Sequence, residues 1–308
     1  MSLVVVGSIA FDAVKTPFGE RERMLGGSAV HFSLAASFFT DVRVVGPVGD
    51  DFGEAERDVL RGRGINIDDI EHVPGGKTFF WAGEYGWDLN DRDTLDTQLG
   101  VFGEFVPKLS EASRSADTLF LANIQPDLQR EVRAQCQGAQ IAGLDSMNLW
   151  IETARESLVK AIGEVDLVFM NDAEIRQLTE QPNLVRGARA VMDMGPHVVV
   201  AKQGEYGAAL FGPDEFFALP AYPLEDVFDP TGAGDSFAGG FLGYLAAQGN
   251  GAHEDEGELR RAMTYGSVLG SFCVEEFGTE RIQRLTREEI DERFSEFKRI
   301  TSFEEVSA

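Results

Sequence analysis

Short apolar runs alternate with amphipathic segments along most of this chain. Runs typical of buried strands occur at 3–9, 42–48, 118–121, 141–144, 166–170, 198–201 and 207–211. Helices are expected at 26–39, 52–63, 126–136, 150–162, 232–247, 258–275 and 287–299. Repeated strand and helix units of this length predict an α/β fold with a mostly parallel central sheet and helices on both of its faces.

The alternation breaks between residues 72 and 102. The aromatic run Phe79-Phe80-Trp81 and the Asp-rich segment after it lack a helical period. We expect extra strands here that form a small β lid together with residues 11–25. The aromatic rings could stack on a nucleobase or fill the lid's own small core. No repeat or linker divides the chain, so residues 1–308 are predicted to form a single domain.

A turn of small residues leads into the helix expected at 232–247. Gly232, Ala233 and Gly234 carry little bulk, so their backbone N–H groups can approach a ligand at the positive end of the helix dipole. This arrangement predicts an anion hole for a phosphate group. Asp235 follows directly and could accept a proton there, although an Asp in a first turn is also a common helix cap.

The full string Asp-Pro-Thr-Gly-Ala-Gly-Asp-Ser at 229–236 resembles the C-terminal signature of the PfkB, or ribokinase-like, family of carbohydrate and nucleoside kinases. The resemblance implies a ribokinase-like fold and covers nearly the whole chain. It implies that Asp235 is the catalytic base and that the Gly-Ala-Gly backbone is the anion hole. It also implies that a monovalent cation such as K⁺ would lie at Asp229 and Thr231.

Asn171 and Glu174 follow the strand run at 166–170 and open a helix. Their spacing is that of a capping box, which explains both residues without a ligand. The same tetrapeptide resembles the family's Asn-x-x-Glu motif, which implies a role in holding hydrated Mg²⁺ near the phosphates. Because Mg²⁺ keeps several waters and takes few protein ligands, the two readings are compatible.

Two further segments match places where the family binds its nucleotide. Lys202, Gly204 and Gly207 have the spacing Lys-x-Gly-x-x-Gly after a strand, which is also an ordinary hairpin pattern. The resemblance implies that this loop lies near ATP. In the family, a helix at the position of the small-residue helix later in this chain lines the adenine pocket. The resemblance therefore implies adenine contacts at Ser267, Val268 and Ser271. Close packing between helices is the alternative explanation of these small residues.

The acceptor is expected to bind near the N-terminus. Family members grip the hydroxyl groups of the acceptor at positions that match Asp12, Gly26, Gly27 and Ser28. Sugar kinases of the family commonly carry Asn shortly after the Gly-Gly pair, whereas this chain has Ser28, Ala29 and His31. The identity of the acceptor therefore stays open, and His31 faces either the site or the core.

Charge and cysteine content narrow the remaining possibilities. The chain has 52 acidic and 27 basic residues, for a formal charge of −25, which argues against nucleic acid or an anionic membrane as partner. An acidic, hydrated surface suited to a salty cytoplasm is one explanation. Cys136 and Cys273 stand far apart, which predicts no disulfide framework or zinc site and favours a reducing compartment. We expect a cytoplasmic protein that can form a homodimer through the lid.

Together these patterns predict an enzyme that uses ATP and Mg²⁺ to phosphorylate a hydroxyl group of a small sugar, with K⁺ as a candidate further cofactor. A nucleoside kinase acting on adenosine-like acceptors is the alternative, since the run at 271–278 resembles archaeal nucleoside kinases of the family. A protein of another class, which keeps the fold and binds a nucleotide or sugar without catalysis, is the third hypothesis.

Overall fold

A nine-stranded sheet forms the centre of the computed structural model, which describes residues 2–90 and 92–302. Its strand order is β13-β12-β11-β10-β9-β8-β1-β4-β5, and all neighbours from β5 to β11 are parallel, whereas β12 and β13 are antiparallel. The strands are β1 Ser2–Val6, β4 Asp41–Val48, β5 Ile70–His72, β8 Thr118–Leu121, β9 Ile141–Asp145, β10 Leu167–Asn171, β11 Val198–Lys202, β12 Ala208–Phe211 and β13 Phe216–Leu219. The residues at positions 1, 91 and 303–308, which belong to the predicted domain and lid, lie outside the described residues.

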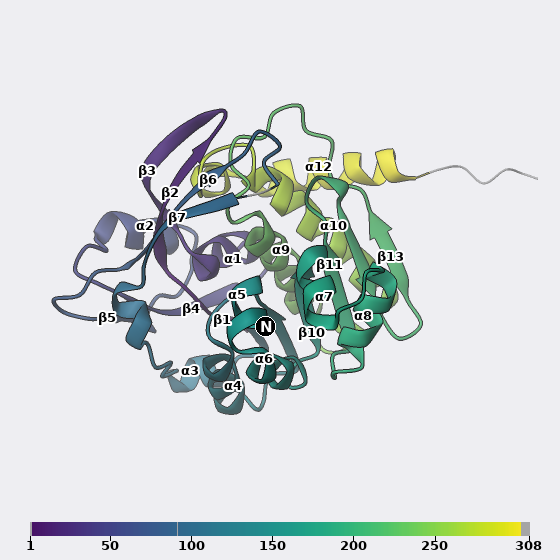
Figure 1. The fold of residues 1–308 in the computed structure, drawn as a ribbon, viewed down its shortest axis with the longest axis horizontal. Coiled ribbons are helices and arrows are strands. Elements are labelled where there is room, and N and C mark those ends of the chain that lie inside the picture. Colours follow the sequence, from purple (N-terminus) through teal and green to yellow (C-terminus); the bar gives the residue numbers. More distant parts are fainter. Residues whose placement is uncertain (1, 91, 303–308) are drawn as a thin grey trace, which may run out of the picture.

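Helices cover both faces of this sheet (Figure 1). One face packs against α1 Ser28–Ala36, α9 Ala233–Gln248, α10 Glu256–Cys273, α11 Glu280–Arg284 and α12 Arg287–Thr301. The other packs against α4 Pro126–Gln135, α5 Asn148–Thr153, α6 Arg155–Ile162, α7 Asp172–Thr179 and α8 Leu184–Met192. Short helices α2 Glu54–Gly62 and α3 Glu111–Arg114 complete the set. Successive residues of β1 enter opposite cores: Leu3 and Val5 face one, Val4 and Val6 the other.

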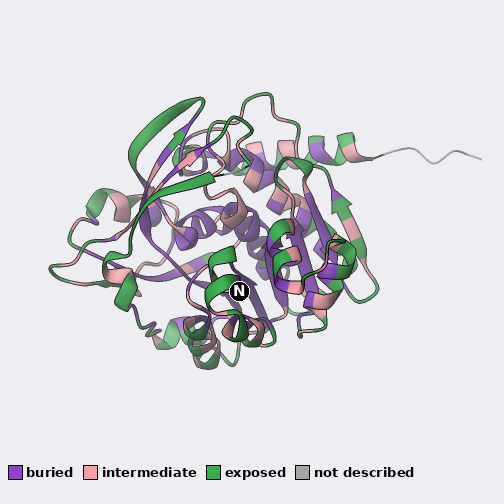
Figure 2. Cartoon of the chain, in the orientation of Figure 1, coloured by how far each residue is buried: buried purple, intermediate pink, exposed green. Residues whose placement is uncertain are grey.

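A second, four-stranded sheet stands at the upper left of Figure 1. Its order is β3-β2-β6-β7, with β2 Ala10–Thr16, β3 Gly19–Gly26, β6 Phe79–Tyr85 and β7 Arg92–Gln98. It has a small apolar cluster of its own, formed by Val14, Met24, Tyr85 and Phe277. Every residue of β7 is exposed, in contrast to the buried strands of the large sheet (Figure 2). This sheet is built from the segments that we expected to form a lid.

The polar stretch before the first helix is the β2–β3 hairpin, so Asp12 lies in a strand of the second sheet. Two local features differ from the sequence-based expectations. The helix expected over 150–162 is two helices, because the backbone of Ala154 leaves the helical region with φ −144°. Helix α8 was not expected, although Leu184, Ala188 and Val191 recur there at helical spacing.

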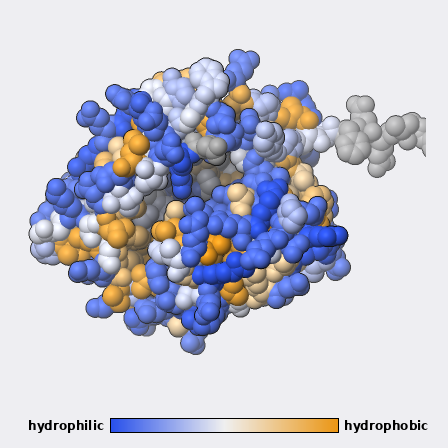
Figure 3. Space-filling view, viewed as in Figure 1, coloured by the Kyte–Doolittle hydropathy of each residue, from blue (hydrophilic) through white to orange (hydrophobic). Residues whose placement is uncertain are grey.

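The exterior is mostly hydrophilic in the view of Figure 3, with apolar residues in small scattered groups. Within the described residues, no helix is both long and apolar enough to cross a bilayer. Cys136 and Cys273 are buried and unpaired.

Candidate active site

The glycine turn lies where the carboxyl end of the large sheet meets the start of α9. Gly232 precedes the helix with φ 77°, a conformation that side chains disfavour. A Cβ added at Gly232 would overlap the imidazole of His31, and one added at Gly234 would lie 3.1 Å from Nζ of Lys202. The turn is therefore held between a histidine ring and an ammonium group, with no room for larger residues.

The backbone N–H groups of this turn are only partly used within the protein. Ala233 N–H donates to the carbonyl of Pro230 at 3.2 Å, and Ser236 N–H donates to the carbonyl of Gly232 at 2.8 Å. Gly234 and Asp235 lie in the first turn of α9, where N–H groups have no acceptor within the helix. These donors and the helix dipole make the turn a suitable place for an anion.

Asp235 projects from this first turn into a half-buried position. Burial raises the pKa of its carboxyl group to about 7, and the neighbouring charge of Asp145 raises it further, whereas Lys202 and Arg92 lower it. A carboxyl group with a pKa near the working pH is better matched to general base catalysis than an ordinary Asp. The chemistry proposed for Asp235 is therefore compatible with its surroundings.

His31 is buried beneath the glycine turn. Its side chain is 2 % exposed, its Nε2 has no hydrogen-bond partner among the described residues, and its Nδ1 lies 3.9 Å from Sγ of Cys273. Burial lowers the pKa of His31 to about 4, so the ring is neutral at physiological pH. Of the two positions that the sequence left open for His31, the structure shows the packed one, directly beneath Gly232.

A buried ion pair joins the ends of β9 and β11, the two strands that flank β10 in the large sheet. Nζ of Lys202, the last residue of β11, lies 2.6 Å from Oδ2 of Asp145, the last residue of β9. Burial alone would lower the pKa of Lys202, but the carboxyl groups of Asp145, Glu174 and Asp235 outweigh it and raise that pKa. Lys202 therefore stays charged beside the turn. Asp145 was missed in the sequence, where it follows an apolar strand like many loop residues.

Asn171 and Glu174 form the capping box that their spacing predicts. The N–H of Glu174 donates to Oδ1 of Asn171 at 2.7 Å, and the N–H of Asn171 donates to Oε2 of Glu174 at 2.8 Å. Burial raises the pKa of Glu174 to about 7, although Lys202 opposes this. Among the described residues, Oε1 of Glu174 accepts no hydrogen bond, so one carboxylate oxygen remains for a cation or its water.

Asp229 closes the loop before the glycine turn. Its side chain is completely buried, Oδ1 accepts the N–H of Thr231 and Oδ2 accepts the N–H of Gly278, both at 2.9 Å. Burial raises the pKa of Asp229, while these hydrogen bonds lower it. The Thr231 hydroxyl donates to the hydroxyl of Tyr85, at 3.1 Å, which ties the second sheet to the loop.

Asp12 lies in β2, on the second sheet, with 6 % of its surface exposed. Gly26 on β3 gives its carboxylate room, since a Cβ there would collide with the Asp12 oxygen atoms. Burial raises the pKa of Asp12 to about 7; a backbone hydrogen bond from Gly27 lowers it, whereas the charges of Asp229 and Asp235 raise it. The structure therefore brings Asp12 into the same electrostatic neighbourhood as the glycine turn.

Gly27 and Ser28 form the start of α1 beside Asp12. Gly27 has φ 95°, and a Cβ there would lie 2.5 Å from the carbonyl oxygen of Ser8. The Ser28 N–H donates to the hydroxyl of Ser8, and the Ser8 N–H donates to the hydroxyl of Ser28. This reciprocal pair fixes the junction of β1 and α1. It also gives the hydroxyl group of Ser28 a structural role at this junction.

The residues expected around the nucleotide differ in how far they are exposed. Gly204 and Gly207 have positive φ and bound a short exposed turn after Lys202. In α10, Ser267 is half-buried, whereas Val268 is completely buried in the apolar core. Ser271 is buried as well, donates to the carbonyl of Val268 and accepts a hydrogen bond from Arg293. The structure thus leaves Ser267 accessible and does not bring Val268 to a surface.

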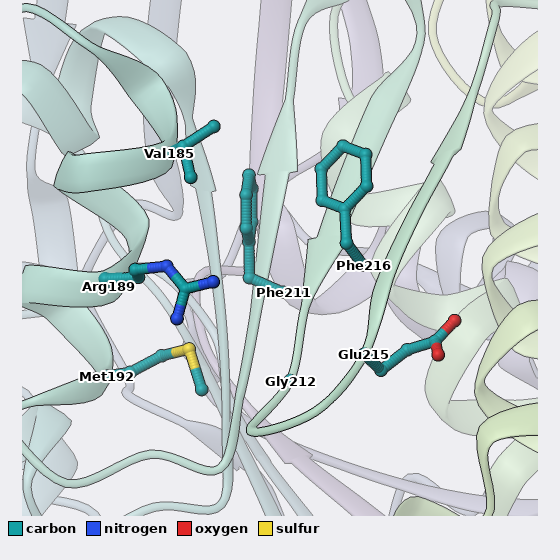
Figure 4. A pocket seen from close by; sticks show the side chains of 7 residues that line it. All are labelled: Val185, Arg189, Met192, Phe211, Gly212, Glu215 and Phe216. Carbon is teal, nitrogen blue, oxygen red and sulfur yellow. The ribbon is translucent and has the colours of Figure 1, made fainter.

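An apolar groove of about 240 Å³ lies elsewhere, between α8 and the β12–β13 hairpin (Figure 4). It is lined by Val185, Arg189, Met192, Phe211, Gly212, Glu215 and Phe216. Phe211 pairs with Val199 in the antiparallel ladder, near the amino end of β11, whereas Lys202 marks its carboxyl end. The groove therefore lies toward the amino ends of the strands, whereas Lys202 and Asp145 lie at the carboxyl ends. It is not part of the candidate site.

At the carboxyl ends of the parallel strands, a glycine turn at a helix start, the carboxyl group of Asp235 and the Lys202–Asp145 pair have the arrangement expected of a phosphotransferase. Residues 2–284 match the family model of the PfkB family of carbohydrate kinases. The chain belongs to this family, whose members phosphorylate an alcohol group of a sugar or nucleoside. The resemblance stated from the sequence is confirmed.

Several characterised proteins are similar to this chain. A cytidine kinase from Thermococcus kodakarensis is 30% identical over 253 residues, which cover 79% of this chain and 87% of the relative. A nucleoside kinase from Methanothermobacter thermautotrophicus is 28% identical over 300 residues, covering 90% and 91%. An ATP-dependent ribose-1-phosphate kinase from Halopiger xanaduensis is 28% identical over 256 residues, covering 81% and 80%.

The fold has close structural counterparts. The crystal structure of the nucleoside kinase from Methanocaldococcus jannaschii, a ribokinase-family member, superposes with a TM-score of 0.77 and 20% identity, covering 96% of this chain and 98% of the other. The predicted ribokinase-like fold is thereby confirmed.

Proposed function

We propose that this protein transfers the γ-phosphoryl group of ATP to a hydroxyl group of a small sugar. The observation that carries the proposal is the position of Asp235, whose carboxyl group has a pKa of about 7 and directly follows the N–H groups of the glycine turn. Phosphoryl transfer requires mainly alignment and charge stabilisation, and this site offers both. The acceptor hydroxyl loses its proton to Asp235 as the new P–O bond forms and the bond to ADP breaks.

Asp12 and the Gly26-Gly27-Ser28 turn are the proposed acceptor site. A carboxylate and nearby backbone groups suit the vicinal hydroxyls of a furanose ring, and the second sheet that carries Asp12 would act as a lid over them. Lys202, Gly204, Gly207 and Ser267 are proposed to face the nucleotide, because Lys202 Nζ already lies beside Gly234. Val268 and Ser271 contribute through the packing of α10 and not through direct contact.

The cations are proposed at two places. Glu174, with one free carboxylate oxygen, and Asn171 would hold Mg²⁺ through water, and the metal would neutralise phosphate charge. Asp229 and Thr231 would serve a monovalent cation such as K⁺. The fit is chemical: the carboxyl group of Asp229 is fully buried, and the groups that act on its pKa are backbone and hydroxyl donors with no basic side chain.

A nucleoside acceptor is the second candidate. It is favoured by the similarity to relatives named cytidine kinase and nucleoside kinase over most of the chain. A furanose sugar and the ribose of a nucleoside would both present vicinal hydroxyls to Asp12, so the choice between them depends on what fills the rest of the site. We further propose a cytoplasmic location and a homodimer through the exposed edge of β7, where Leu95 is 60 % exposed.

The test is acceptor-dependent release of ADP from Mg-ATP with ribose, ribose 1-phosphate, fructose, 2-keto-3-deoxygluconate, cytidine, adenosine and inosine, with Mg²⁺ and K⁺ titrated for the best acceptor. A sugar or sugar phosphate should give the highest kcat/KM. A response to nucleosides alone would replace the sugar by the second candidate. Silence across the panel at low and molar KCl would revive a binding protein without catalysis.

A further inference from the structure

Arg92 is the first residue of β7, at the part of the second sheet that contacts the glycine-turn loop. In the antiparallel ladder Arg92 is the partner of Tyr85 on β6. The hydroxyl of Tyr85 lies 3.1 Å from that of Thr231, one residue before Gly232. Directly opposed residues of a ladder have Cα atoms about 5 Å apart. The backbone of Arg92 is therefore one side-chain length from the loop that forms the anion hole.

The guanidinium group of Arg92 is oriented by an aromatic ring. Its Cζ lies 5.5 Å from the ring centre of Trp81, a cation–π distance. Trp81 pairs with Asp12 across the parallel strands β6 and β2, and its indole crosses Gly83, where a Cβ would overlap it. Trp81 Nε1 donates to the hydroxyl of Thr94 at 3.3 Å. The indole is thus fixed on the side of the sheet that carries Asp12, and it supports Arg92 there.

Acidic side chains outnumber basic ones around the glycine turn. The carboxyl groups near the turn are those of Asp12, Asp145, Glu174, Asp229 and Asp235. Lys202 is already paired with Asp145 at 2.6 Å, so its charge is largely compensated. A phosphoryl group that passes between Asp235 and the acceptor would meet a net negative field at that point.

Arg92 is exposed and makes no salt bridge within the described residues, so its charge is available to a ligand. After the dominant effect of burial, its positive charge is among those that lower the pKa of Asp12 and Asp235. These two groups come from β2 and α9. The pairing of Arg92 with Tyr85 and the contact of Tyr85 with Thr231 put Arg92 beside the glycine turn as well.

We propose that Arg92 binds the phosphoryl group during its transfer and stabilises the charge on its equatorial oxygens. This inference rests on the proposed phosphotransferase function. A guanidinium group suits the task because it presents N–H donors in a planar fork and stays protonated throughout. Arg92 neither gives up nor takes a proton: the proton of the acceptor goes to Asp235, and the electron pair of the broken bond leaves with ADP.

The activity test compares Arg92→Ala and Arg92→Lys with Arg21→Ala. Arg21 is a matched control, because it lies on β3 of the same sheet, over the ring of Phe277 at 4.7 Å and 3.5 Å from Glu280, away from the acids of the site. We expect Arg92→Ala to lower kcat by roughly a hundredfold or more, with less than about a threefold change in the KM of the acceptor. Arg92→Lys should retain part of the rate, added guanidinium should partly restore Arg92→Ala, and Arg21→Ala should match the wild type.

A binding measurement keeps the inference separate from turnover. Calorimetry should show that Arg92→Ala binds Mg-ADP like the wild type but loses at least about tenfold in affinity for Mg-ADP with aluminium fluoride, a mimic of the transferred group. Equal affinity of both proteins for the aluminium fluoride complex would overturn the role of Arg92. So would a raised acceptor KM at unchanged kcat, which would make Arg92 an acceptor-binding residue. A wild type without any acceptor-dependent activity would instead refute the proposed function itself.

Discussion

The two sheets of this molecule contribute to one site in different ways. At the carboxyl ends of the large sheet's strands, polar groups hold one another: Lys202 is paired with Asp145, and Asn171 and Glu174 form a capping box. In the second sheet β7 is exposed along its whole length. Its polar groups reach the site through single contacts such as that of Tyr85 with Thr231.

This difference indicates that the two sheets have different roles in the proposed reaction. Groups that must hold a phosphate in fixed geometry come from strands with helices on both faces, where packing allows little movement. Groups that must let the acceptor enter and leave come from a sheet with a small apolar cluster, in which Val14, Met24 and Tyr85 of the sheet pack against Phe277 from the loop between α10 and α11. A layer with so few buried contacts opens at a lower free-energy cost than the large sheet.

The largest effect on turnover is expected from a change at Asp235, the proposed base beside the large sheet. Asp235→Asn keeps the shape of the side chain but cannot accept the proton, so turnover should fall by about a hundredfold or more. ATP affinity and Tm should stay close to those of the wild type. Asp127→Asn, in the exposed first turn of α4, is the matched control and should leave turnover unchanged. A large loss of stability in Asp235→Asn without loss of turnover would make Asp235 a structural cap.

The next effect separates close packing from backbone strain at the glycine turn. Gly232 and Gly64 both have positive φ, at 77° and 72°, but a Cβ at Gly64 would meet no atom within 4 Å. Gly64→Ala should therefore cost about 1 kcal/mol from strain alone. Gly232→Ala should cost about 2 kcal/mol more, because the methyl group meets the ring of His31. Urea unfolding measures both, and equal losses would show that the turn has room to move.

The pH dependence should reveal the raised pKa values of the buried acids. Burial raises the pKa of Asp235, Asp12 and Glu174 to about 7, above their values of about 4 in the unfolded chain. The folded protein therefore binds more protons than the unfolded one between these values, and the stability of the ligand-free protein should fall as pH rises from about 4 to 7. Over the same window kcat/KM should rise with an apparent pKa near 7, as the base loses its proton.

Thermal unfolding and initial rates at pH 5 to 8 test both signs. Asp235→Asn removes one of the three groups, so its fall in stability over this range should be smaller than that of the wild type. Stability that rises with pH over the window, together with a flat kcat/KM, would show that these carboxyl groups are already ionised in the folded protein.

The smallest effect per residue concerns the surface. With a formal charge of −25, exposed acids repel one another, and salt screens that repulsion. Tm should rise from low to molar KCl, and NaCl should serve as the control for specific K⁺ binding at Asp229. A flat or falling Tm across the KCl series would remove the idea of an acidic surface adapted to high salt.

Much of the site at the carboxyl ends of the large sheet's strands could be predicted from the sequence, because its motifs are short and local. The glycine turn and the capping box each lie within a few consecutive residues, so their spacing alone indicates their shape. The parallel sheet followed from the apolar strand runs. The positions of Asp12 and of its glycine neighbours came from the resemblance to the family, since no local pattern marks them.

The rest depends on contacts between distant segments. Asp145 belongs to the site only because β9 and β11 end at the same edge, two strands apart. Arg92 and Tyr85 belong to it through the register of β6 and β7, in a polar segment without a regular repeat. Packing also decided between alternatives that the sequence left open, as for His31, which lies beneath Gly232, and for Val268, which lies in the core.

The central claim is that this chain moves a phosphoryl group from ATP to an acceptor hydroxyl. The most direct measurement is a single-turnover experiment with ATP labelled in its γ-phosphate, excess enzyme and the best acceptor of the panel. We expect the label to appear in a phosphate ester of the acceptor, in equal amount to ADP, and at least about a hundredfold more slowly with Asp235→Asn. Label found only as inorganic phosphate, at a rate that neither the acceptor nor Asp235→Asn changes, would contradict it.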